Sequence, residues 1–114
     1  MGLITSSLRL QQLKSAKSDI EFKIQTITES KLGLSGQLAE VADQAAMASL
    51  DGTENAETKK LESYKLQLQA IEKQLDASLG RYNNQLKMIE TEIESAQQVI
   101  DKNIQTSFSY GGGK

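Results

Sequence analysis

Apolar residues repeat along the first half of the chain at alternating spacings of three and four. One column runs Leu13, Ile20, Ile27, Leu34, Val41 and Ala48, and the column interleaved with it runs Leu3, Leu10, Ile24, Leu38 and Ala45. This spacing is typical of a helix whose apolar seam faces another helix. It predicts a helix from about residue 6 to residue 50. Gly33 and Gly36 mark a stretch that either bends or lets another backbone approach, but the columns keep their phase there, which favours one continuous helix.

A second stripe begins after Asp51-Gly52 and predicts a second helix from about residue 54 to residue 107. Its members are Leu61, Tyr64, Leu68, Ile71, Leu75, Leu79, Tyr82, Leu86, Ile89, Ile93, Ala96, Ile100, Ile104 and Phe108. The equal steps of four from Ile71 to Leu79 predict a stutter, which locally unwinds a coiled coil. Because glycine commonly ends a helix, we expect the turn at residues 51–53. The glycine-rich residues 111–114 are expected to form a flexible tail.

The two stripes together predict an all-α fold, a long antiparallel two-helix coiled-coil hairpin that forms a single domain over residues 1–110. The basic residues near the N-terminus then meet the acidic residues of the second helix, which favours the antiparallel register. The residues predicted to form the seam are Leu13, Ile20, Ile24, Ile27, Leu34, Leu38, Val41, Leu61, Leu68, Ile71, Leu75, Leu79, Leu86, Ile89, Ile93 and Ile100. A lone hairpin buries only one face of each helix, so we expect the core to be completed by oligomerisation.

Several apolar residues lie outside the main seam or at its C-terminal end, and they are the candidate oligomer contacts. They are Leu8, Phe22, Leu32, Leu66, Ile104 and Phe108. Such residues, repeated along a helix pair, suggest a second contact surface. Lys17 and Lys31 occupy seam positions, where a polar residue either specifies register and oligomer state or extends its stem so that the charge reaches solvent. The sequence leaves these two alternatives open.

The residue types available restrict the chemistry. Cysteine and histidine are absent, so the chain lacks thiolates, the commonest general base and the commonest neutral metal ligand. We therefore expect no enzyme activity, no metal, no cofactor and no small-molecule substrate. The net charge of −2 argues against nucleic acid as a partner. Glu90 and Glu94 have the spacing of a carboxylate pair for a hard cation, but without histidine a solvated helix face is the favoured interpretation.

The N-terminal segment has no continuous apolar region of a secretory signal, and no run is long enough to span a bilayer. Met1-Gly2 opens a sequence that matches the myristoylation pattern, although a helix cap among Thr5, Ser6 and Ser7 explains the same residues. Membrane association is therefore not expected. The location is predicted to be cytoplasmic, or outside the cell after export by a route that needs no such signal.

The last predicted helix ends Val99-Ile100-Asp101-Lys102-Asn103-Ile104-Gln105-Thr106-Ser107-Phe108. This ending is similar to that of type III secretion needle subunits, whose terminal helix closes on an Asp, spaced isoleucines and a Phe. The chain as a whole resembles small secreted helical-hairpin filament proteins, including the needle and filament subunits and the terminal coiled coils of flagellins. The resemblance implies self-assembly, with both termini buried in the filament.

These observations favour a structural, self-assembling coiled-coil subunit of a filament or similar homo-oligomer, whose partner is another copy of the same chain. The alternative is a small adaptor or chaperone-like hairpin that binds a partner helix as a homodimer, in a groove at Lys17 and Lys31. A protein of the membrane surface, using the basic residues near the N-terminus, is the third hypothesis.

Overall fold

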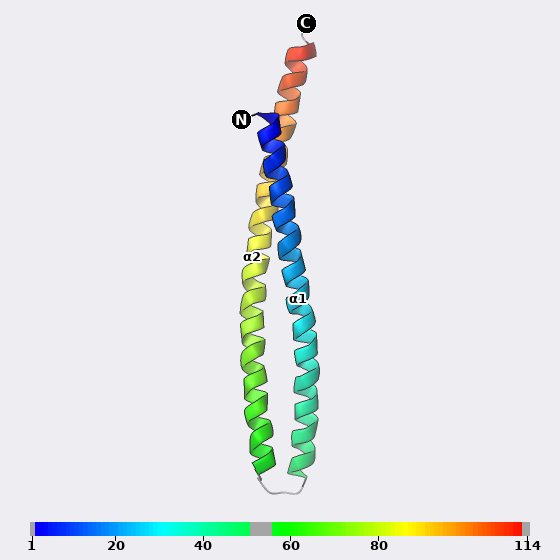
Figure 1. The fold of residues 1–114 in the computed structure, drawn as a ribbon, viewed down its shortest axis with the longest axis vertical. Coiled ribbons are helices and arrows are strands. Elements are labelled where there is room, and N and C mark those ends of the chain that lie inside the picture. Colours follow the sequence, from blue (N-terminus) through cyan, green and yellow to red (C-terminus); the bar gives the residue numbers. More distant parts are fainter. Residues whose placement is uncertain (1, 51–55, 113–114) are drawn as a thin grey trace. The chain divides into compact units, whose positions relative to one another are not determined.

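The computed structural model describes residues 2–50 and 56–112, with side chains described through Thr106. It contains two helices, α1 (Leu3–Ser49) and α2 (Ala56–Gly112), and no strand within these ranges (Figure 1). The chain is thus an all-α helical hairpin, as the two stripes predict. The predicted turn at 51–53 and the predicted start of the second helix lie outside the described residues.

Both helices extend beyond their predicted limits. α1 begins at Leu3 rather than near residue 6, and the backbone N–H of Ser6 donates to the carbonyl of Gly2 at 3.1 Å. α2 continues to Gly112, past the predicted end near residue 107 and into the predicted flexible tail. Glycine weakens a helix but, unlike proline, keeps the N–H that the helical hydrogen bond needs. For the same reason α1 runs without a break through Gly33 and Gly36, which confirms one continuous first helix.

The chain divides into two units, each built from one segment of each helix. The terminal unit consists of Met1–Lys23 and Tyr82–Lys114, and the central unit is Ile24–Arg81. Within each unit the α1 and α2 segments run antiparallel (Figure 1). In the terminal unit the Lys23 ammonium lies 5.5 Å from the centre of the Tyr82 ring.

The core of each unit is a narrow seam between its two helix segments. In the central unit Leu34, Val41 and Leu68 are buried against one another. Leu38, Leu61 and Leu75 pack against this cluster and are half-buried. In the terminal unit Ile20 and Ile100 are the buried apolar side chains. No large side chain among the described residues is fully buried, because a two-helix seam is open along both edges.

We expect Leu68→Ala to lower the free energy of unfolding by about 2 kcal/mol, at the low end for a buried leucine because the open seam lets neighbouring side chains collapse inward. Urea unfolding followed by far-UV circular dichroism measures this change. The matched control is Gln69→Ala, an exposed position on the same turn, which should stay within about 0.5 kcal/mol of the parent. If both variants lost the same free energy of unfolding, the assignment of Leu68 to the seam would be contradicted.

Candidate functional site

The seam residues predicted from the sequence lie where the two helices meet, with one exception. Besides the buried residues, the half-buried ones are Leu13, Ile24, Ile27, Leu38, Leu61, Leu75, Leu79, Leu86, Ile89 and Ile93. On α1 the burial repeats at strict heptad spacing, and the columns continue backward to Ser6, whose side chain is buried. In each unit the seam is thus the surface through which its two helix segments already contact each other.

Ile71 is the exception, and with it the predicted stutter is wrong. Ile71 is 46% exposed, whereas Glu72 is half-buried in the seam. Leu68, Glu72, Leu75 and Leu79 keep the regular steps of four, three and four, so the heptad passes through this region unbroken. The apolar pattern did not reveal Glu72 as a seam residue, because the pattern counts only apolar side chains and Glu72 is acidic. Tyr64, one heptad earlier than Ile71, is likewise 45% exposed.

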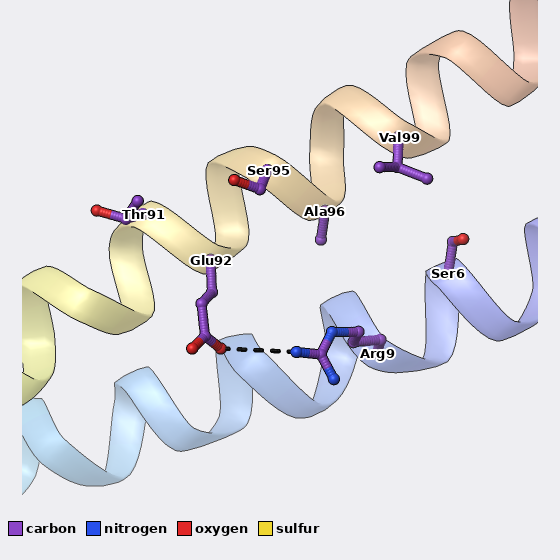
Figure 2. A pocket seen from close by; sticks show the side chains of 7 residues that line it. All are labelled: Ser6, Arg9, Thr91, Glu92, Ser95, Ala96 and Val99. Atoms are coloured by element: carbon purple, nitrogen blue, oxygen red, sulfur yellow. Dashed lines mark ion pairs between the residues drawn. The ribbon is translucent and has the colours of Figure 1, made fainter. Parts of the chain in front are cut away.

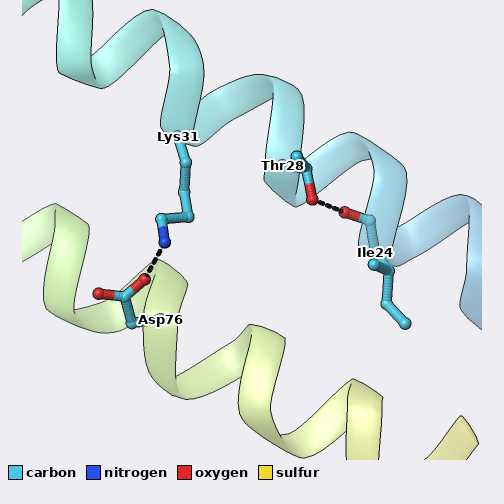
Figure 3. Close-up of polar contacts among 4 residues, drawn as sticks. All are labelled: Ile24, Thr28, Lys31 and Asp76. Carbon is cyan, nitrogen blue, oxygen red and sulfur yellow. Dashed lines mark hydrogen bonds and ion pairs between the residues drawn. The ribbon is translucent and has the colours of Figure 1, made fainter.

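A charged layer explains how the seam accommodates Glu72. The Lys31 ammonium binds the carboxylate of Asp76 across the helix pair (Figure 3). Its hydrogen bond to Asp76 raises the pKa of Lys31; burial opposes this shift, and the negative charges of Asp76 and Glu72 add to it. Thr28, one turn earlier, donates its hydroxyl to the Ile24 carbonyl at 2.8 Å and so is engaged on its own helix (Figure 3). At Lys31 the charge is thus held by an acid of α2, while its role in specifying register or oligomer state stays a prediction.

Lys17 lies two heptads before Lys31 on α1 and is also half-buried. Glu90 lies two heptads after Asp76 on α2, so in an antiparallel pair Lys17 and Glu90 occupy the corresponding place in the terminal unit. Both line a shallow hollow of about 390 Å³ that also includes Glu94. A slip of one heptad would place Lys31 opposite Gln69 or Asn83, so the spacing of lysines and acids disfavours such a slip.

A second hollow of the terminal unit contains small side chains. It has a volume of about 230 Å³, and Figure 2 shows Ser6 of α1 facing it, with Ala96 and Val99 of α2 on the opposite side. At its edge Arg9 pairs with Glu92 at 3.8 Å, and both side chains are at least half exposed. An ion pair this exposed stabilises little. The pair shows, however, that the edge of α1 that carries Arg9 and the edge of α2 that carries Glu92 lie on the same side of the seam.

Asn103 is a seam residue that the apolar pattern did not reveal. It follows Ala96 by one heptad, and its Nδ2 atom is buried without a hydrogen-bond partner among the described residues. A buried asparagine in a coiled-coil seam lowers stability but specifies register and oligomer state. The regular heptad step of three residues from Ile100 to Asn103, in place of the step of four to the exposed Ile104, is the sequence signal that would have found it.

The candidate oligomer contacts are exposed wherever the structure describes them. They are Leu8, Phe22, Leu32, Leu66 and Ile104. The side chain of Phe108 lies outside the described residues. On α1 the heptad puts Leu8, Phe22 and Leu32 on the side turned away from the seam, with Leu32 70% exposed. We call these three residues the outer stripe.

Neither helix contains, in its described residues, an apolar stretch long enough to cross a bilayer. The described residues also contain no group of three or more acidic side chains placed to hold a metal ion. Glu90 and Glu94 therefore lie together without a third acidic ligand there. Comparison with protein families, curated proteins and solved structures found no match to this chain.

Reversing the charge of Lys31 tests the charged layer. We expect Lys31→Glu to lower the thermal midpoint, because it sets a third acid beside Glu72 and Asp76. Asp76→Lys alone should also lower the thermal midpoint, and combining the two substitutions should recover part of the loss.

The pH dependence follows from the pKa of Lys31. Because that pKa is raised in the folded state, the stability that the charged lysine contributes is present below the ordinary lysine pKa of 10.5 and is lost as the pH rises through the raised value.

Circular dichroism melts at low and high salt measure these midpoints, and the differences should shrink at high salt. Lys60→Glu, at an exposed lysine away from the seam, is the control and should change the midpoint little. Strictly additive effects of Lys31→Glu and Asp76→Lys would show that the two side chains do not interact.

Asn103→Leu should stabilise the chain by about 1 kcal/mol, because it removes a buried amide donor that has no partner among the described residues and extends the apolar seam. Urea unfolding measures the gain. Asn84→Leu, at an exposed position of the same helix, controls for the better helix propensity of leucine. If Asn103→Leu destabilises the chain, the amide has a partner that the seam itself does not supply.

Proposed function

We propose that this chain is a structural, self-assembling coiled-coil subunit of a filament or similar homo-oligomer. The observation that carries the proposal is the incomplete core: no large side chain among the described residues is fully buried, while several large apolar side chains are exposed. A helix pair with one narrow seam is marginal on its own, and helices of this kind gain stability by packing against further helices.

The exposed apolar residues fall on more than one side of the helix pair. The outer stripe lies opposite the seam on α1, whereas Tyr64 and Ile71 flank the seam on α2. A chain with a single self-complementary face closes into a dimer, but two different contact faces allow copies to add without closure. The two faces therefore support an open, filament-like assembly.

The ending of α2 supports the same proposal. Residues 99–108 are similar to the terminal helix of type III secretion needle subunits, and the structure is helical throughout this range. The chain offers little for catalysis, because it has no histidine and no cysteine. We therefore propose a structural role without enzymatic activity, with the chain itself as partner.

The hollow beside Lys17 favours one alternative, an adaptor that binds a partner helix as a homodimer. Acidic Glu90 and Glu94 share this hollow with Lys17, and a basic partner helix would complement them. A stable dimer that does not grow with concentration is the result that would favour this alternative.

We expect the wild-type chain to form particles that grow with protein concentration and appear as filaments of uniform width. Sedimentation velocity and negative-stain electron microscopy at low and high concentration measure this. A monodisperse monomer at high concentration would rule the proposal out.

Replacing two residues of the outer stripe tests their role in growth. Leu8→Ser combined with Leu32→Ser should raise the concentration needed for filaments about tenfold or more, because exposed apolar area is lost from the contact. Helicity should persist, since neither side chain is in the seam. Met88→Ser, at another exposed apolar position, is the control and should leave filament growth unchanged.

A further inference from the structure

The middle of one flank of the central seam carries no charge; exposed charged residues stand one heptad beyond it, at Glu40 on α1 and at Lys60 and Arg81 on α2. On α2, Tyr64 and Ile71 lie directly beside the column of Leu68, and on α1, Ser30 and Gln37 lie directly beside the column of Leu34. In an antiparallel pair these two rows lie on the same side. The equivalent positions in the terminal unit are Arg9 and Glu92, which do pair.

We name this surface the uncharged flank. Its members are Ser30, Gly33, Gln37, Tyr64, Gln67, Ile71 and Gln74, all of them exposed. A quarter of the chain is charged, so a run of seven exposed positions on two helices without a charge departs from the average surface. The opposite flank differs, since Lys31 and Asp76 form their ion pair there (Figure 3).

The uncharged flank borders the buried core of the central unit. Leu68 is 4% exposed, whereas Tyr64 and Ile71, the residues four before and three after it, are each nearly half exposed. Their inner atoms therefore pack toward the seam while their outer atoms face solvent. A further layer placed on this flank would bury the remaining apolar surface of both side chains.

Gly33 supplies a second, independent observation on the same flank. A Cβ added at Gly33 would meet nothing within 4 Å, so the fold of a single chain does not require glycine there. Glycine in a helix interior is unfavourable compared with alanine. A bare backbone at this point is useful if another helix approaches α1 closely beside Tyr64 and Ile71.

The accessible surface of the chain is large enough for such a contact. It amounts to 8614 Å², whereas a compact monomer of the same 12.5 kDa mass exposes about 6,200 Å². The excess of about 2,400 Å² belongs to the whole chain, of which the flank is one part, and a standard interface takes roughly 800 Å² from each partner. A second copy is the favoured occupant, because an uncharged surface can face itself without like charges meeting.

We infer that a second copy of this chain docks on the uncharged flank through a two-fold contact, with Tyr64 and Ile71 packing against the partner's same face and Gly33 admitting its backbone. The inference rests on the proposed self-assembly and names its first contact. The outer stripe stays exposed in this dimer and is the surface through which dimers add to one another.

Gly33→Leu and Gly80→Leu form a matched pair that tests the contact. Both replace an exposed helix-interior glycine with open space around it, so both should raise the thermal midpoint of the dilute chain. Only Gly33→Leu places a side chain on the uncharged flank. It should raise the dimer dissociation constant, measured by sedimentation equilibrium, at least tenfold, while Gly80→Leu leaves it unchanged.

Ile71→Glu should weaken the dimer in the same way, because docking would bury an unpaired charge. If Gly33→Leu and Ile71→Glu both associate as the wild type does, the uncharged flank is not the contact, and self-assembly through another face still stands. If the wild type does not associate at all, the proposed function itself fails.

Cross-linking locates the contact without weakening it. The chain has no cysteine, so single cysteines introduced at Ser30, Gln37, Gln67 or Gln74 can form disulfides only between copies. At least one of these variants should give an oxidised dimer at a concentration where the wild type is dimeric. Cysteines at the exposed outer positions Ser63 and Ala77 should not. Dimers cross-linked only through Ser63 or Ala77 would overturn the inference.

Discussion

The constraint on which the rest of this structure depends is that each helix has only one neighbour. Two helices share a single seam, so a residue such as Val41 is buried at the centre while the residues around it keep part of their surface in water. Burial of apolar area is the main stabilising contribution, and here it is limited to one narrow stripe per helix. Regular heptad spacing is therefore required over the length of each helix, because there is no thicker core to compensate for a lapse in the pattern.

Within this limit the seam contains polar residues that a purely stabilising design would avoid. Lys31 and Glu72 occupy heptad positions where leucine would bury more apolar area, and Asn103 places an amide donor there that finds no partner in the part of the chain that the structure describes. Apolar columns alone allow the two helices to slip by whole heptads, because one leucine packs much like another. Lys31, held by Asp76, would lose its acid if the helices slipped by one heptad, so this pair disfavours that slip at some cost in stability.

The same limit connects the fold to the proposed function. Apolar side chains that a two-helix seam cannot cover lie on two sides, at the uncharged flank and along the outer stripe. In the flank, Tyr64 and Ile71 border the buried Leu68, so an added copy would extend an existing core rather than create a new one. The proposed assembly would thus make between chains the same kind of apolar contact that the seam makes within one chain.

The sequence by itself determined the fold class, because a 3-4 apolar spacing interrupted once, near Asp51-Gly52, leaves two long helices that must bury their stripes together. It also located nearly all of the seam, since residues spaced in heptads share one face of a helix. It failed at Ile71, where the apolar pattern and the true seam diverge by one residue. Only the tertiary structure decided that Glu72 enters the seam, because the charge of Lys31 that makes this possible is far away in the sequence and comes near only when the helices pair.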